Sequence, residues 1–392
     1  MPEYLAPGVY VEETSFRSKS IEGVSTSTTG FVGPTCKGPT TGTPELLTSF
    51  GDFERIYGGY ENLQFSGGEA INYIATAVKN YFDNGGSRLY VARVTTDRAE
   101  PGAAAYKAPL AALGAIEDIS IIAAPGYSSF AANNRQGIQN ALIAHAERSG
   151  AYRIAVLDTP RAQTPTAALS VKSRVDSSYA ALYYPWVFVS NPLAQPGNKN
   201  IAQEILLPPS GFVCGIYART DKTRGVNKSP ANETVRGALR LEIDIGLADQ
   251  ERLNRNGVNC LRFFPGHGNL LWGARTTSSD PEWEYVNTRR YLIYLEHTID
   301  RSTQWAVFEN NGPQLWAKMR ESVSSFLYNE WVSGALLGVS ADEAFFVRCD
   351  RTTMTQDDLD NGRLICLIGV SALKPAEFIV FRIGQKTADT DS

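Results

Sequence analysis

The chain has 392 residues, of which 43% are hydrophobic and 20% are charged, and its formal net charge is −4. This composition is that of an ordinary globular protein and leaves room for two domains with a sizeable core each. The slight acidic surplus does not favour direct binding to nucleic acid, which usually requires a basic surface.

Residues 1–29 are expected to form an N-terminal arm and tether. A short strand-like piece, Val9-Tyr10-Val11, is followed by a Ser/Thr-rich stretch from Thr14 to Thr29. Such a segment buries little surface by itself. The opening lacks the basic and apolar regions of a secretory signal, and no run reaches the roughly 18 apolar residues of a membrane span. We therefore expect folding in a cytoplasm, without membrane insertion.

Residues 30–280 show an alternation of strands and helices that predicts an α/β domain. The patterns favour helices over 69–83, 135–148 and 166–175, and strands over 88–94, 119–123, 153–157 and 183–189. Near-continuous apolar strands separated by helices are typical of a mostly parallel sheet with both faces covered. The fold class predicted for this part is a doubly wound α/β domain.

Residues 281–383 have a different pattern, which predicts an α+β module. Helices are expected over 285–308 and 313–329, then strands over 344–349, 363–370 and 377–383, with a turn in the polar segment 355–362. Helices followed by strands suit an α+β arrangement. Residues 384–392 are a polar tail.

The residues that suggest catalysis have simpler structural interpretations. Asp158 after a strand and His267 in a Gly-His-Gly turn are two parts of a serine-protease triad, but no Ser-containing elbow accompanies them. Asp158 is therefore interpreted as a cap or turn residue. His145 is expected on a helix surface, and His297 is expected to pair with a carboxylate of its own helix. The histidines do not have metal-ligand spacing, so no zinc site is predicted.

The cysteines give no sign of a metal or redox centre. They are scattered and odd in number, and we expect buried free thiols at Cys36, Cys214, Cys260, Cys349 and Cys366. Together with the missing triad, this predicts no catalytic residue, no metal and no cofactor. The alternative from another class is an α/β hydrolase-like enzyme without recognisable motifs.

The most distinctive stretch runs from residue 257 to 296. It contains Phe264-Pro265-Gly266, Trp272-Gly273-Ala274-Arg275-Thr276 and Tyr285-Val286-Asn287-Thr288-Arg289-Arg290. This order resembles the signature of contractile tail sheath proteins, which occur in phages with contracting tails and in related bacterial injection particles. Further segments also resemble the family in order, namely 4–13, 207–232 and the C-terminal module with Pro375-Ala376-Glu377-Phe378-Ile379.

The resemblance implies a structural subunit that polymerises as a helical stack of hexameric rings around an inner tube and contracts to drive the tube through a target envelope. It implies a subtilase-like α/β domain without an active site, assembly in a bacterial cytoplasm, and membership of a phage tail or injection particle. The implied partners are other copies of the chain, the inner tube protein, and baseplate and tail-terminator proteins. A baseplate or tube component fits less well, because those proteins lack the long α/β domain.

The two chain ends are predicted to complete β-structure in neighbouring subunits. Exposed on one copy, such strands would leave backbone groups unpaired, whereas in a neighbour's sheet they become added strands. A head-to-tail interface of this kind gives rings or helical tubes. The residues expected to exchange are Val9, Tyr10, Val11, Phe378, Ile379, Val380, Phe381 and Ile383.

The inner-tube contact is assigned by the resemblance to the C-terminal module and to electrostatic attraction. Four basic residues on the two predicted helices are the candidates: Arg289, Arg290, Lys318 and Arg320.

Overall fold

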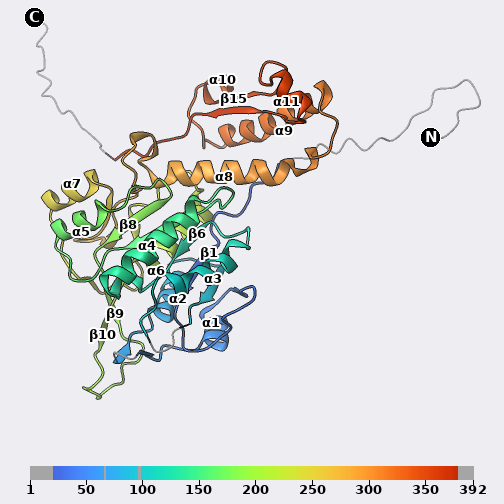
Figure 1. Cartoon of the computed structure of the whole chain (residues 1–392). Coiled ribbons are helices and arrows are strands. Elements are labelled where there is room, and N and C mark those ends of the chain that lie inside the picture. Colours follow the sequence, from blue (N-terminus) through green and yellow to red (C-terminus); the bar gives the residue numbers. More distant parts are fainter. Residues whose placement is uncertain (1–20, 66–67, 96–98, 378–392) are drawn as a thin grey trace, which may run out of the picture. The chain divides into compact units, whose positions relative to one another are not determined.

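The computed structural model describes residues 21–377 apart from 66–67 and 96–98 (Figure 1). These residues divide into two compact units. The α/β unit comprises residues 23–297 and 372–377, and the C-terminal unit comprises residues 298–371 with residues 21 and 22. The helix α8 (Val286–Thr303) spans the division. The domain boundary predicted at 280/281 stays a prediction.

A nine-stranded sheet with a parallel centre forms the middle of the α/β unit. Its strand order is β11-β14-β13-β8-β7-β6-β1-β5-β2. The parallel strands are β5 (Leu89–Arg93), β1 (Thr29–Gly33), β6 (Ile121–Ala123), β7 (Ile154–Asp158), β8 (Ala180–Tyr184) and β13 (Val258–Phe264). Antiparallel strands close the two sides: β2 (Leu46–Leu47), β14 (Gly268–Leu271) and β11 (Glu233–Thr234).

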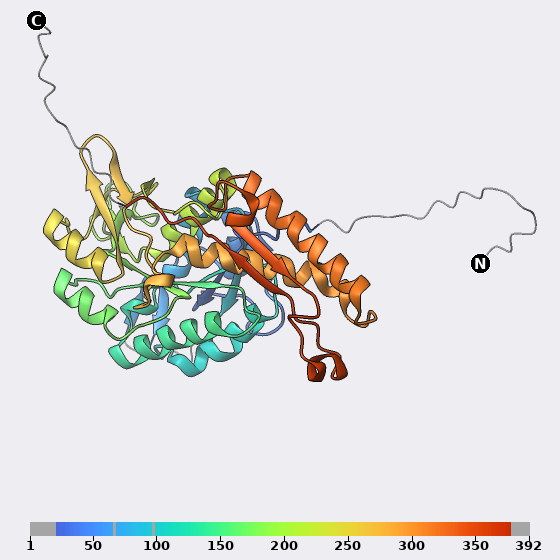
Figure 2. The ribbon, with the colours of Figure 1, turned by 90° about the horizontal axis from the view of Figure 1, so that it is seen from above.

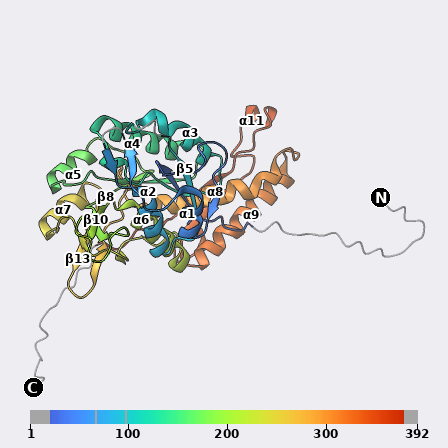
Figure 3. The same cartoon turned by 90° about the horizontal axis from the view of Figure 1, so that it is seen from below.

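Helices cover both faces of this sheet, as Figure 3 shows. One face packs against α1 (Phe50–Tyr57), α2 (Tyr73–Asp83) and α6 (Ser210–Arg224). The other packs against α3 (Ala103–Gly114), α4 (Ala132–Glu147), α5 (Pro165–Lys172) and α7 (Leu247–Arg255). Successive strand residues serve opposite faces, so Phe31 lies in one hydrophobic cluster and Val32 in the other. The mixed α/β class predicted from the alternating pattern is confirmed.

The strand predicted over 183–189 is in fact two strands in different sheets. β8 ends at Tyr184, a cis peptide bond joins Tyr184 to Pro185, and β9 (Val187–Ser190) begins after it. Pro185 has no amide hydrogen to continue the ladder. β9 instead pairs antiparallel with β10 (Glu204–Leu207) and β12 (Arg240–Leu241). A small hairpin, β3 (Leu63–Phe65) and β4 (Gly68–Ala70), and two 3-10 turns, Tyr127–Ser129 and Pro281–Trp283, complete this unit.

The C-terminal unit consists of a long helix and a two-stranded sheet. After the 3-10 turn Gln304–Ala306, the helix α9 (Pro313–Val332) buries Leu315, Trp316, Met319, Val323, Phe326 and Leu327. α10 (Ala341–Ala344) leads into β15 (Phe345–Arg348), which pairs antiparallel with β16 (Leu367–Val370). α9 and the two strands lie side by side in Figure 2.

The segment 355–362, predicted as a turn, contains the short helix α11 (Gln356–Asp360). Thr355 and Asp358 form a capping box that supplies partners for the free amides at its start. Of the strand predicted over 377–383, only Glu377 is among the residues that the structure describes.

The prediction that His145 lies on a helix surface is wrong. His145 is 8% exposed, and its Nε2 lies 2.7 Å from Nη1 of Arg153, which is itself 1% exposed. Arg153 also donates to the carbonyl oxygens of Ile119 and Ile116. Burial and the neighbouring Arg153 lower the pKa of His145 to about 4, so the ring is a neutral hydrogen-bond acceptor at pH 7.

None of the helices within the described ranges combines the length and apolar character that a bilayer crossing requires.

Close packing of α6 on α2 depends on two glycines of the segment 207–232. A Cβ at Gly211 would lie 2.8 Å from Cα of Ala77, and one at Gly215 would lie 2.5 Å from the carbonyl oxygen of Tyr81. Side chains at these positions would therefore push the two helices apart.

We expect Gly215→Ala to lower the free energy of unfolding by about 1–3 kcal/mol, because the added methyl group meets backbone atoms that cannot yield. Urea denaturation measures the change. Gly51→Ala in the exposed helix α1, where the nearest atom lies 3.7 Å away, is the matched control and should be neutral or slightly stabilising. Equal effects of the two substitutions would contradict the packing argument.

Candidate anchoring site for the chain ends

The first turn of α8 is fixed by the residues that precede it. Arg275 and Tyr285 form an isolated antiparallel bridge, and the amide of Val286 donates to the carbonyl of Ala274 over 3.0 Å. The side chain of Asn259 on β13 accepts from the amide of Arg275 over 2.6 Å and donates to its carbonyl over 2.7 Å. The side chain of Asn259 thereby pairs with the backbone of Arg275 as a neighbouring strand would, and it sets the direction in which α8 begins.

Arg290 on α8 joins three distant parts of the α/β unit. Its guanidinium donates to both carboxylate oxygens of Asp221 on α6, over 2.8 and 2.6 Å, and to the carbonyl of Thr26 over 3.0 Å. The hydroxyl of Thr26 donates to the same carboxylate over 2.7 Å. Arg290, Asp221 and Thr26 form what we call the Arg290 cluster.

The Arg290 cluster is buried, which makes its pairing electrostatically strong. The side chains of Arg290 and Asp221 are 2% and 3% exposed. Burial alone lowers the pKa of Arg290, but the Asp221 carboxylate outweighs it and the net shift is upward. The guanidinium also lies over the ring of Tyr217, 4.7 Å from its centroid. The buried guanidinium therefore depends on the Asp221 carboxylate for its charged state.

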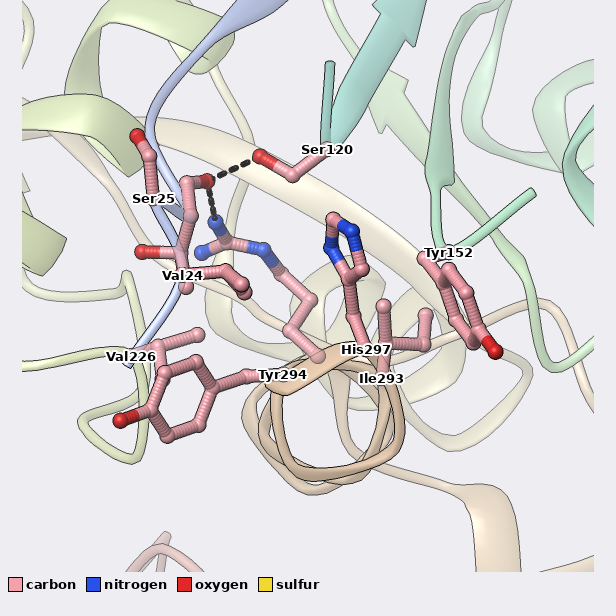
Figure 4. Close-up of a pocket in the computed structure, with 10 residues that line it drawn as sticks. Val24, Ser25, Ser120, Tyr152, Val226, Ile293, Tyr294 and His297 are labelled. Atoms are coloured by element: carbon pink, nitrogen blue, oxygen red, sulfur yellow. Dashed lines mark hydrogen bonds between the residues drawn. The ribbon is translucent and has the colours of Figure 1, made fainter. Parts of the chain in front are cut away.

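The segment that precedes β1 is attached to the domain around this cluster (Figure 4). Ser120 donates to the carbonyl of Thr26, and the hydroxyl of Tyr81 donates to the carbonyl of Ser27 over 3.1 Å. Val24 and Ser25 line a small pocket beside Ser120 and His297. The Ser/Thr-rich stretch predicted as a tether is thus fixed to the α/β unit at its C-terminal end.

The ring of His297 lines this pocket and packs on a neighbouring aromatic ring. Its ring stacks on Tyr152, with centroids 4.7 Å apart and planes inclined by 10°. Figure 4 shows the two rings face to face. The predicted pairing of His297 with a carboxylate of its own helix stays a prediction.

Arg275 holds the other end of the described chain. It donates from Nε to Glu377 over 3.1 Å, pairs with the same carboxylate through Nη2, and contacts Glu284 through Nη1. The hydroxyl of Tyr285 donates to Glu377 over 3.5 Å. Burial lowers the pKa of Arg275, but the hydrogen bond and charge of Glu377 raise it more. We call this group the Arg275 cluster.

Asn287 provides a second attachment for the same C-terminal segment. Its amide nitrogen donates to the carbonyl of Leu373 over 3.2 Å and to that of Asn227 over 3.0 Å. Leu373 and Glu377 are both held by residues next to the start of α8. Both ends of the described chain are therefore fastened at one place in the α/β unit.

The sequence-based assignment of Arg289 and Arg290 to inner-tube contact needs correction. Arg290 is 3% exposed and Arg289 is 5% exposed. Arg289 donates to Ser178 over 2.8 Å and stacks 3.5 Å above the ring of Trp283. Both guanidinium groups bond to residues of the α/β unit, and each occupies a polar site beside α8. Lys318 and Arg320, in contrast, are exposed on α9.

Asp158 caps a helix, as predicted. Its two carboxylate oxygens accept from the amide and the hydroxyl of Ser210 at the start of α6, over 2.8 and 2.7 Å. Burial raises the pKa of Asp158 to about 7. Asp158 and His267, which suggested a triad and were interpreted otherwise, have separate environments: Asp158 bonds to Ser210, and His267 lies in the exposed turn after β13.

The remaining site predictions concern residues outside the described ranges and the cysteines. All the residues expected to exchange, Val9 to Val11 and Phe378 to Ile383, lie outside the described residues. Cys214, Cys260 and Cys349 are buried free thiols as predicted, whereas Cys36 is exposed and Cys366 is half-buried. Among the described residues no group of His, Cys, Asp and Glu has the arrangement of a metal site.

Sequence patterns identified the segments of these clusters but missed their partners. Asp221 lies in the segment 207–232 and Glu377 in the motif at 375–379, yet nothing in the spacing connects either residue to an arginine of the segment 257–296. The only signal was a charged residue within each motif. The pairing itself requires the fold.

The geometry defines a site in which buried charged groups fasten Thr26 and Glu377 to the α/β unit. Two family models match the chain: the phage tail sheath protein central domain over residues 99–277 and the phage tail sheath C-terminal domain over residues 278–386. The chain belongs to the contractile tail sheath protein family.

Individual relatives agree with this assignment. The chain is 26% identical over 267 residues to a prophage major tail sheath protein of Pseudomonas aeruginosa, covering 67% of this chain and 64% of the relative. It spans a smaller share, 27% to 29%, of three phage tail sheath proteins. The chain thus covers less than two thirds of the length of the curated relatives it matches.

Solved structures match over nearly the whole chain. The helical sheath of the anti-feeding prophage in its contracted state is 28% identical, with a TM-score of 0.78, covering 98% of this chain and 100% of that one. The sheath complex of the PVC extracellular contractile injection system, also contracted, is 26% identical, with a TM-score of 0.76 and coverages of 98% and 99%. An α/β hydrolase-like enzyme is not supported by these likenesses.

We expect Asp221→Asn to lower the free energy of unfolding by about 3–5 kcal/mol, because it leaves the buried Arg290 without a counter-charge. Urea denaturation followed by tryptophan fluorescence measures the loss. The control is Glu204→Gln, which breaks a 2.7 Å pair with Arg240 whose side chains are 39% and 55% exposed. That change should cost less than about 1 kcal/mol. Similar losses in both variants would contradict the role of burial.

Proposed function

We propose that this chain is a non-catalytic structural subunit of a contractile tail sheath. Copies polymerise as a helical stack of hexameric rings around an inner tube, and contraction drives the tube through a target envelope. The family assignment and the likeness to two contracted sheath structures support this proposal. The particle is a phage tail or phage-tail-like injection device, assembled in a bacterial cytoplasm and completed by baseplate and terminator proteins.

One observation carries the proposal: the sheet of the C-terminal unit has only two strands among the described residues. Two strands are marginal by themselves, and a free strand edge presents unpaired backbone groups. Apolar side chains of this sheet are also exposed, with Phe346 and Leu367 each 49% exposed and Ile368 36% exposed. The sheet has the properties of an acceptor for further strands.

The occupants that we propose for this acceptor are the chain ends of neighbouring copies. The segments Val9–Val11 and Phe378–Ile383 have the β-branched and aromatic composition of strands. The Arg275 cluster holds the chain at Glu377, directly before the second segment, whereas the Arg290 cluster holds it at Thr26, beyond the linker that follows the first segment. A terminal strand that pairs with a neighbour's sheet and is anchored to its own domain can transmit force between the two copies.

Contraction requires subunits that move while they stay linked. The linking segment of the N-terminal arm must lie upstream of Val24, because residues from Thr26 onward are bonded to the α/β unit. Residues 14–23 are mostly polar and contain three serines, a composition that we expect of a linker. The subtilase-like description of the α/β domain belongs to this proposal and rests on the resemblance.

Deletion of residues 1–20 should abolish tube formation, because the acceptor sheets would lose their incoming strands. Electron microscopy of the purified protein gives the readout. Deletion of the polar residues 384–392 is the matched control and should leave assembly intact. Normal tubes from the protein without residues 1–20 would remove the arm from the mechanism.

The inner-tube contact that remains after the correction is the exposed face of α9 with Lys318 and Arg320. Lys318→Glu should reduce co-purification of the inner tube protein, because it replaces an attractive charge by a repulsive one. Lys318 is the cleaner test, since Arg320 also donates to the carbonyl of Cys349 over 2.9 Å. Lys107→Glu, on the exposed surface of α3, is the control. Unchanged tube recovery with Lys318→Glu would rule out this face.

A further inference from the structure

Two cysteines face each other where the β15–β16 ladder ends. The last described pair of the ladder is Arg348 with Leu367, so the next residues on the antiparallel strands are Cys349 and Cys366. Both are free thiols. Cys349 is 0% exposed, whereas Cys366 is half-buried and within reach of small molecules in solution.

The ladder places this pair at the favourable kind of position for a disulfide. The amide of Ser371 donates to the carbonyl of Ala344 over 2.8 Å, which makes 344/371 a hydrogen-bonded position. Positions alternate along an antiparallel ladder, so 349/366 is a non-hydrogen-bonded position, where facing Cα atoms lie about 4.5 Å apart. Disulfides form at Cα separations of about 4.4–6.8 Å. The backbone therefore needs no rearrangement.

The thiols already interact in the reduced state. Burial raises the pKa of both, that of Cys366 to about 12, and the neighbouring Cys349 thiol adds to the upward shift of Cys366. Arg320 donates to the carbonyl of Cys349 and keeps this end of the strand in place. Without an oxidant the pair stays reduced. Because protonated thiols are slow nucleophiles, oxidation of the pair is slow near neutral pH and becomes faster as the pH rises.

We propose that Cys349 and Cys366 form a reversible intrachain disulfide that locks β15 to β16 when the protein meets a low-molecular-weight disulfide. The thiolate of Cys366 attacks one sulfur of the reagent and releases one small thiolate. The thiolate of Cys349 then attacks the Cys366 sulfur and releases the second. Two protein thiols are oxidised, one small disulfide is reduced to two thiols, and the two protons pass to the released thiolates.

The bond would fix the register of the acceptor sheet. It closes the loop that contains α11 and holds the two strands together at the end opposite to Ala344 and Ser371. The inference concerns the chain by itself and does not depend on the proposed assembly. In a cytoplasm the pair remains reduced, whereas an oxidising surrounding favours the bond.

The test uses the full chain in its native state, treated with glutathione disulfide at about pH 9, because thiols with a raised pKa exchange faster as the pH rises. After alkylation, trypsin cuts following Arg348, Arg351 and Arg363, so Cys349 and Cys366 fall on separate peptides. We expect a linked species of these two peptides that disappears on reduction. Most of the chain should carry this link, while Cys214 and Cys260 remain alkylated as free thiols.

Cys36 serves as the internal control, because it is exposed and should form a mixed disulfide with glutathione. A chain with modified Cys36 but with Cys349 and Cys366 unlinked would overturn the proposal, as would glutathione found on Cys366 in place of the internal link. In Cys349→Ser the mixed disulfide on Cys366 should accumulate, since the second step is lost. Cys36→Ser should leave the internal link unchanged.

Discussion

The structure depends above all on a charged interior contact between Arg290 and Asp221. Two helices distant in the sequence, α8 and α6, meet through this pair, and the carbonyl of Thr26 completes the coordination of the guanidinium. A buried pair is not in itself a large source of stability, because desolvation offsets much of the attraction. It is, however, specific. Among the described residues the two side chains form their ion pair with each other, so the pair fixes which segments come together.

The sequence predicted the α/β unit well because its strands and helices are set by local patterns. The strands β5 to β8 are almost uninterrupted apolar runs, which can be recognised without knowing their neighbours. The strands β1 and β13 were not predicted, because glycines or polar residues interrupt their apolar residues. Failures occurred where the determining contact is distant. His145 looked like a surface residue because its partner Arg153 approaches from a strand, and the predicted strand 183–189 broke at Pro185, which forces a change of sheet.

The candidate site was predictable as a set of segments but not as an arrangement. The run Tyr285 to Arg290 stood out in the sequence, and its arginines suggested a surface for a partner. In the fold these side chains point to the interior, because α8 begins against β13 and carries its polar residues into gaps that the chain ends fill. In this chain the signature marks a place where the α/β unit holds its own segments together.

The position of both attachments around the start of α8 has a mechanical consequence. Tension applied to either terminal segment reaches the domain through an arginine, which contacts the carboxylate of Glu377 at one end and the carbonyl of Thr26 at the other. Along the chain, the two arginines are separated only by the turn before α8 and by the first turns of that helix. A pull on either terminus therefore reaches a polar contact beside the start of α8 before it reaches the central sheet.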